Sequence, residues 1–181
     1  MRQSLLVLVL FLVCGSLFSA SAQQPAPLAA FTTQATLILV RHAEKAGPKG
    51  DVPLTEAGKV RATALAHVLR NANISTIFTT NLQRTQQTAA PLAKALNLKP
   101  VVLPVEDSAG LAAKLAALPA GSTALVVNHN PLVLQLATAF GAKNVADMDE
   151  QEFDRMMILT PGADGKSVLL TLRYGAPTPT P

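Results

Sequence analysis

The sequence predicts an α/β domain, a three-layer sandwich with a mostly parallel central sheet and helices on both faces. Short runs rich in Val, Ile and Leu alternate with longer segments in which apolar residues recur at helical spacing. The strand-like runs lack the alternation of a half-exposed strand, so we expect them to be buried on both faces. Strands that alternate with helices in this way are typical of a parallel sheet. With 181 residues, 49% of them hydrophobic, the chain is long enough for one such domain.

The predicted elements follow one another along the chain. The strand-like runs are 36–40, 74–79, 100–103 and 123–127. The helix-like segments are 55–69, 82–96, 109–118 and 131–140. Two further runs, 153–160 and 167–174, flank a loop that contains Asp164-Gly165, which predicts a terminal hairpin or a pair of edge strands.

The helix starts carry capping signals. Thr55 is the expected N-cap of the first helix, because its hydroxyl can accept a hydrogen bond from the first turn. Either Asp107 or Ser108 could cap the third helix, and Asn130-Pro131 predicts an N-cap followed by proline at the first helical position. Apolar residues at helical spacing predict the buried stripe of the first helix: Ala57, Val60, Ala64, Leu65, Val68 and Leu69.

The first 22 residues read as a signal peptide. A positive start is followed by a nearly continuous hydrophobic run, 5–18, and by Ala20-Ser21-Ala22, the small-x-small pattern of a cleavage site. We therefore expect a periplasmic or secreted protein with no membrane span after cleavage; the alternative is an uncleaved anchor, for which the apolar run is short. The predicted organisation is a signal peptide (1–22), a flexible lead-in (23–34), the α/β domain (35–175) and a Pro/Thr tail (176–181).

Composition excludes several function classes. Cys14, the only cysteine, lies in the signal, so the mature chain has no thiol nucleophile, disulfide or cysteine metal site. The net charge of +4 is diffuse, and only 4% of the residues are aromatic, so we expect no nucleic-acid partner. We expect no metal and no cofactor. The oligomeric state is open.

Chemically distinctive residues follow the predicted strands. In a parallel sheet, ligands bind beyond the carboxyl ends of the strands. Arg41-His42 follows the first strand, Arg84 comes shortly after the second, and His129 follows the fourth. Arginine offers forked, permanently charged donors that match phosphate oxygens, and a neutral histidine can attack phosphorus. The sequence therefore predicts a site for phosphoryl transfer to histidine.

Four ordered blocks resemble the histidine phosphatase (phosphoglycerate mutase-like) superfamily, over about residues 36–140. They are Leu-Val-Arg-His-Ala-Glu (39–44), Leu-Thr-Glu-Ala-Gly-Lys-Val-Arg-Ala (54–62), Thr-Thr-Asn-Leu-Gln-Arg-Thr-Gln-Gln-Thr-Ala (79–89) and Val-Asn-His (127–129). The resemblance implies that His42 accepts the phosphoryl group, while Arg41, Arg84 and His129 line the phosphate pocket.

The chain departs from the family pattern in three places. Ala43 replaces the usual glycine, Asn128 and Asn130 flank the second histidine, and the stretch 104–111 is short where phosphoglycerate mutases carry the catalytic acid. This compact layout resembles the small phosphatases of the superfamily, including those that act on protein phosphohistidine. Glu106 is the candidate general acid; the alternatives are Asp107 and a site with no general acid.

We therefore expect an exported, metal-independent phosphatase that hydrolyses a phosphomonoester or phosphoramidate through phosphohistidine. Its substrate would be a small phosphorylated molecule or a phosphohistidine protein. The alternative is a non-catalytic anion- or partner-binding protein that retains the fold. We interpret His67 as structural or surface, Glu44 as a supporting or solvated carboxylate, and the acidic run 147–154 as a solvated loop.

Overall fold

The computed structural model describes residues 28–162 and 166–178. The predicted signal peptide, the start of the lead-in and the last three residues of the tail lie outside these ranges. Among the described residues, no helix combines the length and the apolar character needed to span a bilayer.

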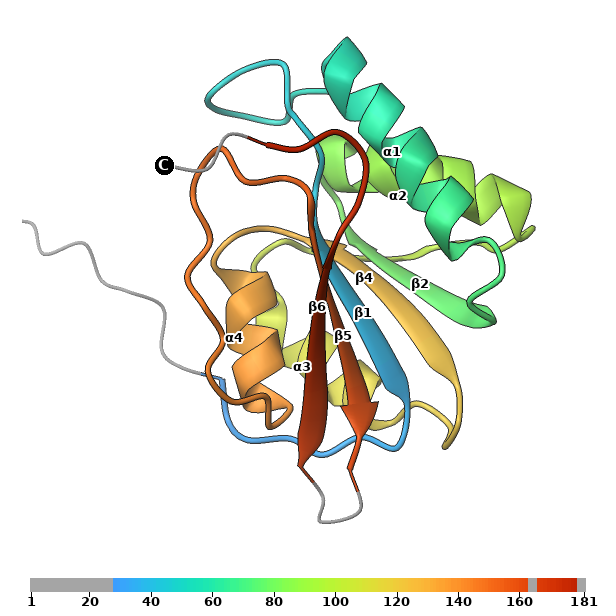
Figure 1. The fold of residues 1–181 in the computed structure, drawn as a ribbon, viewed down its shortest axis with the longest axis vertical. Coiled ribbons are helices and arrows are strands. Elements are labelled where there is room, and N and C mark those ends of the chain that lie inside the picture. Colours follow the sequence, from blue (N-terminus) through green and yellow to red (C-terminus); the bar gives the residue numbers. More distant parts are fainter. Residues whose placement is uncertain (1–27, 163–165, 179–181) are drawn as a thin grey trace, which may run out of the picture.

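The described residues form a six-stranded sheet with the strand order β3-β2-β4-β1-β5-β6 (Figure 1). The first four strands of this order run parallel, whereas β5 is antiparallel to β1 and β6 is antiparallel to β5. The prediction of a mostly parallel sheet that ends in a hairpin is confirmed, and β6 is an edge of the sheet. The strands are β1 (Thr36–Arg41), β2 (Ile74–Thr80), β3 (Val101–Leu103), β4 (Thr123–Asn128), β5 (Arg155–Pro161) and β6 (Ser167–Arg173).

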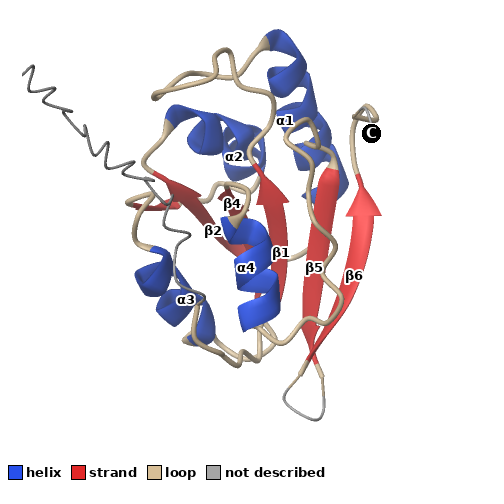
Figure 2. Cartoon of the chain, turned by 90° about the vertical axis from the view of Figure 1, so that its left-hand side faces the viewer, coloured by secondary structure: helices blue, strands red, loops and turns tan. Residues whose placement is uncertain are grey.

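Helices cover both faces of the sheet, as predicted (Figure 2). Alternate residues of β1 point to opposite faces, so Leu37 and Leu39 join one core and Ile38 and Val40 the other. The first core packs against α3 and α4, the second against α1 and α2. The helices are α1 (Glu56–Leu69), α2 (Gln83–Ala95), α3 (Ser108–Ala116) and α4 (Leu132–Ala139).

Two of the predicted helix caps are confirmed, and one is wrong. Thr55 accepts a hydrogen bond from the Gly58 amide at 3.0 Å. Asp107 caps α3 by accepting from the Gly110 amide at 2.9 Å. Asn130 does not cap α4: the N-cap position is Pro131, and the Asn130 side-chain amide donates to the Met148 carbonyl.

The buried stripe predicted for α1 is partly wrong. Val60 is 69% exposed and Val68 51% exposed, although Leu65 and Leu69 are buried as expected. The stripe is rotated because Arg61 turns inward, where its guanidinium binds the Glu44 carboxylate and the carbonyl of Tyr174. A charged side chain therefore takes a place in this face that apolar spacing had assigned to valine.

The described end of the lead-in is packed against the domain, which corrects the prediction of a flexible segment for residues 28–34. The Phe31 ring stacks on Phe140 at 5.7 Å, and the Phe31 amide donates to the Ala139 carbonyl. Thr33 is buried and its hydroxyl donates to the Leu115 carbonyl. These contacts tie the segment to α3 and to the end of α4.

Candidate active site

The carboxyl ends of β1, β4 and β2 lie side by side, because β4 is between the other two strands. Arg41 is opposite Asn128 in the β1–β4 ladder, so the next residues, His42 and His129, are neighbours. Their ring centroids are 5.1 Å apart. Arg84, in the first turn of α2, is close enough for its charge to affect both imidazoles. The structure thus brings together four of the predicted site residues.

His42 is held with one ring nitrogen free. Its side chain is buried, and its backbone amide donates to the Asn128 carbonyl at 2.9 Å. Nδ1 lies 2.7 Å from the Ala43 carbonyl oxygen, which can only accept, so Nδ1 carries the proton. Nε2 then has a lone pair, which is what a nucleophile needs.

His129 is the end of a chain of hydroxyl groups that sequence reasoning did not identify. The Thr85 hydroxyl lies 2.8 Å from the Thr80 hydroxyl and also donates to the Leu82 carbonyl. Thr80 Oγ1 is in turn hydrogen-bonded to His129 Nε2 at 3.2 Å. This chain of contacts fixes the orientation of the His129 ring. Thr80 and Thr85 lie within the third sequence block. The position of that block after a predicted strand was the signal that could have identified them.

Both imidazoles are neutral near pH 7. Burial lowers the pKa of His42 to about 3; the bond to Ala43 opposes the shift, and the charges of His129, Arg41 and Arg84 add to it. Burial lowers the pKa of His129 to about 4, with further contributions from Arg84, Arg41 and Lys45. The neutral state is the one in which His42 can attack phosphorus.

Arg41 is buried, and backbone carbonyls bind one nitrogen of its guanidinium. Its Nη1 donates to the carbonyls of Asp149, Glu150 and Glu152, at 3.1, 2.8 and 3.3 Å. Its guanidinium carbon lies 4.4 Å from the centre of the Phe153 ring, a contact that sequence reasoning missed. The Nε atom is buried without a hydrogen-bond partner.

Arg84 is held more loosely and shares one feature with Arg41. Its Nη1 donates to the Gly50 carbonyl at 3.0 Å, and its Nε is also buried without a partner. A buried donor without an acceptor is costly unless a ligand supplies one. Arg41 and Arg84 each offer such a donor, and the charges of both lower the pKa of His42 and His129. Together they are suited to bind an anion.

Glu106 and Asp107 differ in what the structure shows. Asp107 is engaged as the α3 cap. Glu106 is exposed in the loop between β3 and α3, and that loop is joined to the start of α2 by the hydrogen bond from the Val105 amide to Asn81 Oδ1. The assignment of Glu106 as the general acid stays a prediction.

Glu44 has a supporting role. Its carboxylate accepts from Arg61 Nε at 3.0 Å and Nη2 at 2.7 Å. A Cβ at Gly58 would overlap the Glu44 carbonyl oxygen, so glycine at this position lets α1 approach the residues that follow His42. His67, in contrast, is exposed on α1 and takes no part in the site.

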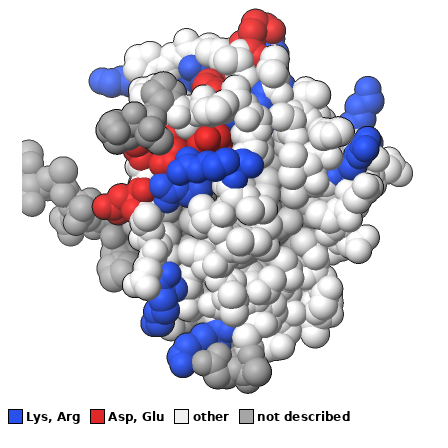
Figure 3. Space-filling view, viewed as in Figure 1, with Lys and Arg blue, Asp and Glu red and all other residues white. Residues whose placement is uncertain are grey.

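A cavity of about 380 Å³ opens beside Arg41, between the loop after β1 and the segment 150–153. Basic and acidic side chains both line it, among them Lys45, Glu44 and Glu150. Figure 3 shows acidic and basic side chains gathered in one area of the surface. Within the described part of the chain, no group of three or more His, Cys, Asp or Glu side chains could hold a metal ion.

Residues 37–112 match the family model described as "Histidine phosphatase superfamily (branch 1)". This range contains His42, Arg84 and Glu106, and ends before His129. No curated protein matches the chain by sequence. The four sequence blocks predict a resemblance to this superfamily. The match of the family model supports that prediction independently.

Several solved structures have the same fold. The protein histidine phosphatase SixA complexed with tungstate has a TM-score of 0.62 at 20% identity and covers 76% of this chain and 96% of its own. A mycobacterial glucosyl-3-phosphoglycerate phosphatase with inorganic phosphate has 0.60 at 19%, covering 78% and 97%. YhfR of Bacillus stearothermophilus has 0.59 at 17%, covering 75% and 95%. The chain therefore has the histidine phosphatase fold, and the predicted resemblance is confirmed.

Proposed function

From this fold and the geometry at the ends of β1 and β4, we propose that the protein is a phosphatase that works through a phosphohistidine at His42. The observation that carries the proposal is the pairing of two neutral, neighbouring imidazoles with two arginines whose buried Nε donors lack acceptors. A phosphoryl group at this place would receive donors from both arginines and from His129.

The reaction would proceed in two displacements. In the first, His42 Nε2 forms a bond to phosphorus, the bond from phosphorus to the leaving group breaks, and a basic leaving group takes a proton from Glu106 or from water. In the second, water attacks phosphorus and gives up a proton to the same carboxylate or to water, the bond from phosphorus to His42 Nε2 breaks, and inorganic phosphate leaves. Arg41 and Arg84 would stabilise the charge that spreads over the phosphoryl oxygens in both steps. None of these steps requires a metal ion.

The direct test is to trap the intermediate on the protein without residues 1–22. Labelled substrate should leave an acid-labile, base-stable label, and His42→Ala should abolish both the label and the turnover of p-nitrophenyl phosphate. His67→Ala removes an exposed histidine and is the matched control, which should keep both. Label that persisted in His42→Ala would move the nucleophile elsewhere. A protein that bound phosphate but never turned over would support the non-catalytic alternative.

We propose that the substrate is a small phosphorylated molecule or a protein-borne phosphohistidine. The loop between β3 and α3 is short, so it builds no cap over the site. If Glu106 is the general acid, Glu106→Gln should slow the hydrolysis of alkyl phosphates by roughly 10²–10⁴-fold and spare p-nitrophenyl phosphate, whose leaving group needs no proton donor. Equal rates in the variant and the wild type would make Glu106 a bystander and favour a phosphoramidate or activated ester.

We also propose that the protein is exported, on the evidence of the pattern in residues 1–22. Expression of the full chain with a C-terminal tag, followed by mass measurement, tests this. A mature protein that begins near Gln23 supports export with cleavage. A full-length mass in the membrane fraction would support the uncleaved anchor.

A further inference from the structure

The segment before β5 is folded around Arg41. The carbonyls of Asp149, Glu150 and Glu152 all accept from Arg41 Nη1, so three acceptors converge on one nitrogen. Nε has no partner, and Nη2 has only a 3.5 Å contact with the exposed Glu150 carboxylate. The segment 149–152 thus holds one side of the guanidinium and leaves the Nε–Nη2 edge for a ligand.

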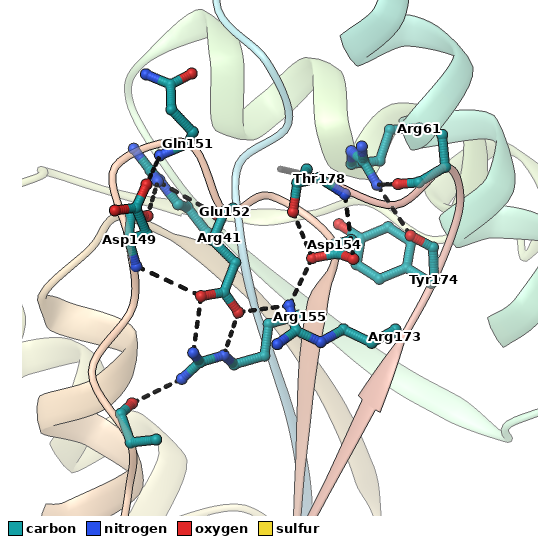
Figure 4. A network of polar contacts seen from close by, with 12 residues as sticks. Arg41, Arg61, Asp149, Gln151, Glu152, Asp154, Arg155, Arg173, Tyr174 and Thr178 are labelled. Carbon is teal, nitrogen blue, oxygen red and sulfur yellow. Dashed lines mark hydrogen bonds and ion pairs between the residues drawn. The ribbon is translucent and has the colours of Figure 1, made fainter. Parts of the chain in front are cut away.

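Glu152 holds this segment in shape (Figure 4). Its carboxylate is buried, and Oε2 accepts from the Asp149 amide at 3.4 Å. Arg155 donates to both carboxylate oxygens, at 2.5 and 2.8 Å, and Arg173 donates to Oε1 at 2.6 Å. One carboxylate therefore joins the start of the turn to both strands of the terminal hairpin.

The interpretation of residues 147–154 as a solvated loop is partly wrong: Asp147, Asp149 and Glu150 are exposed, but Glu152 and Asp154 are buried. Arg155 Nη1 and Nη2 also donate to the carbonyls of Ala146 and Asp147, both at 2.6 Å. Asp154 is buried and pairs with Arg173 and Thr178. Burial raises the pKa of Glu152, but the bond from Arg155 and the charges of Arg155 and Arg173 outweigh it, so the pKa is lowered and the group stays ionised.

We propose that Glu152 is a positioning residue for Arg41: its ionised carboxylate holds the 149–152 turn so that the Nε–Nη2 edge of Arg41 is presented to the phosphoryl group. Glu152 acts through Arg41, and its carboxylate touches no substrate. The inference rests on the proposed function. It gives the terminal hairpin a role in anion binding, although the hairpin lies outside the matched range 37–112 and carries neither of the two histidines.

Asp154 provides a matched control. Both residues are buried carboxylates on the same segment, and both accept from Arg173. They differ in their other partners: Glu152 accepts from Arg155 and from the Asp149 amide, and its own carbonyl accepts from Arg41, whereas Asp154 accepts from Thr178. Glu152→Gln and Asp154→Asn should both lower the melting temperature, because each removes a buried negative charge, but only Glu152→Gln should change how Arg41 binds anions.

The experiment measures orthovanadate binding by calorimetry, together with kcat and KM for p-nitrophenyl phosphate. We expect Glu152→Gln to weaken vanadate roughly tenfold, the lower end of what outer partners of ligating residues are worth, and Asp154→Asn to change it less than about twofold. In an Arg41→Ala background, Glu152→Gln should cause no further loss of affinity, because a residue that acts through Arg41 has nothing left to position.

Two results would overturn the proposal: equal weakening by Glu152→Gln and Asp154→Asn, or a loss from Glu152→Gln that persists when Arg41 is alanine. If Glu152→Gln does not fold, Arg173→Gln removes a half-exposed partner of the same carboxylate, and it should weaken vanadate more than Asp154→Asn does. Binding that depends on Glu152 without any turnover would sustain this inference while the phosphatase proposal fails, so the two are separable.

Discussion

The end of β1 and the first turn of α2 each contribute an arginine to the site, but the two are supported differently. Arg41 is 5% exposed, and three carbonyls and the Phe153 ring hold its guanidinium. Arg84 is half-buried, and its guanidinium donates to the carbonyl of Gly50, in the loop that follows β1. The first arginine is part of the packed structure, whereas the position of the second depends on a surface loop.

This difference separates two kinds of contribution to anion binding. A guanidinium that is fixed before the ligand arrives loses little freedom on binding, so its donors act at nearly full strength in the transition state. The loop that holds Arg84 is itself tied to α2, since Asp51 accepts from the Gln83 amide and Gln87 accepts from the Leu54 amide. Arg84 itself, however, bonds one carbonyl of that loop, whereas three carbonyls hold Arg41. We therefore expect Arg41 to be preorganised and Arg84 to adjust when a phosphoryl group binds.

Arg41→Ala should have the largest effect, on both activity and stability. We expect a loss of about 4 kcal/mol in transition-state stabilisation, the upper end of the range for one preorganised donor. The free energy of unfolding should fall by about 1–3 kcal/mol, because the carbonyls of the 149–152 segment lose their donor. Steady-state kinetics and urea unfolding measure the two. An unchanged unfolding midpoint would show that Arg41 is no part of the packed structure.

Arg84→Ala should affect activity without affecting the fold. The expected loss is about 2–4 kcal/mol in kcat/KM, with a change in unfolding free energy within about 0.5 kcal/mol. Inhibition by vanadate or phosphate should weaken in parallel, because the same donor is lost. Unchanged inhibitor affinity would place Arg84 outside the pocket. A stability loss equal to that of Arg41→Ala would remove the contrast between the two arginines.

A further prediction concerns the pH dependence of stability. In the unfolded chain a histidine titrates near 6.5, whereas the pKa is about 3 for His42 and about 4 for His129 in the folded protein. Below pH 6.5 the unfolded state therefore binds more protons than the folded state. The free energy of unfolding should have its full value above pH 6.5 and fall as the pH drops towards 4. Unfolding midpoints against pH measure this, and His42→Asn should flatten the slope.

The arginine variants refine the same measurement. The charge of Arg41 lowers the pKa of His42 more than the charge of Arg84 does. For His129, Arg84 has the larger effect. In a titration of the imidazole signals by NMR, Arg41→Ala should thus raise the pKa of His42 more than Arg84→Ala does. For His129, Arg84→Ala should have the larger effect. The reverse pattern would mean that each arginine lies nearer the other histidine.

The element types were predictable because their signals are local. Strands buried on both faces carry continuous apolar runs, and the caps at Thr55 and Asp107 use donors only three residues away. Ligands bind beyond the ends of parallel strands, and this rule places Arg41, His42 and His129 together from the sequence alone. Apolar spacing failed on α1 because it counts apolar residues alone, whereas Arg61 is buried on that helix and pairs with Glu44.

What the sequence determined by itself was the α/β order, the strand ends and the residues that follow them. Only the tertiary structure decided how those residues are held. The carbonyls that bind Arg41 are 108 to 111 residues away from it, and α2, whose N-cap Leu82 has no capping side chain, is capped by Asp51 from another loop. The physical reason is that hydrogen-bond acceptors on the backbone are present at every residue, so their use depends on which segments meet in space.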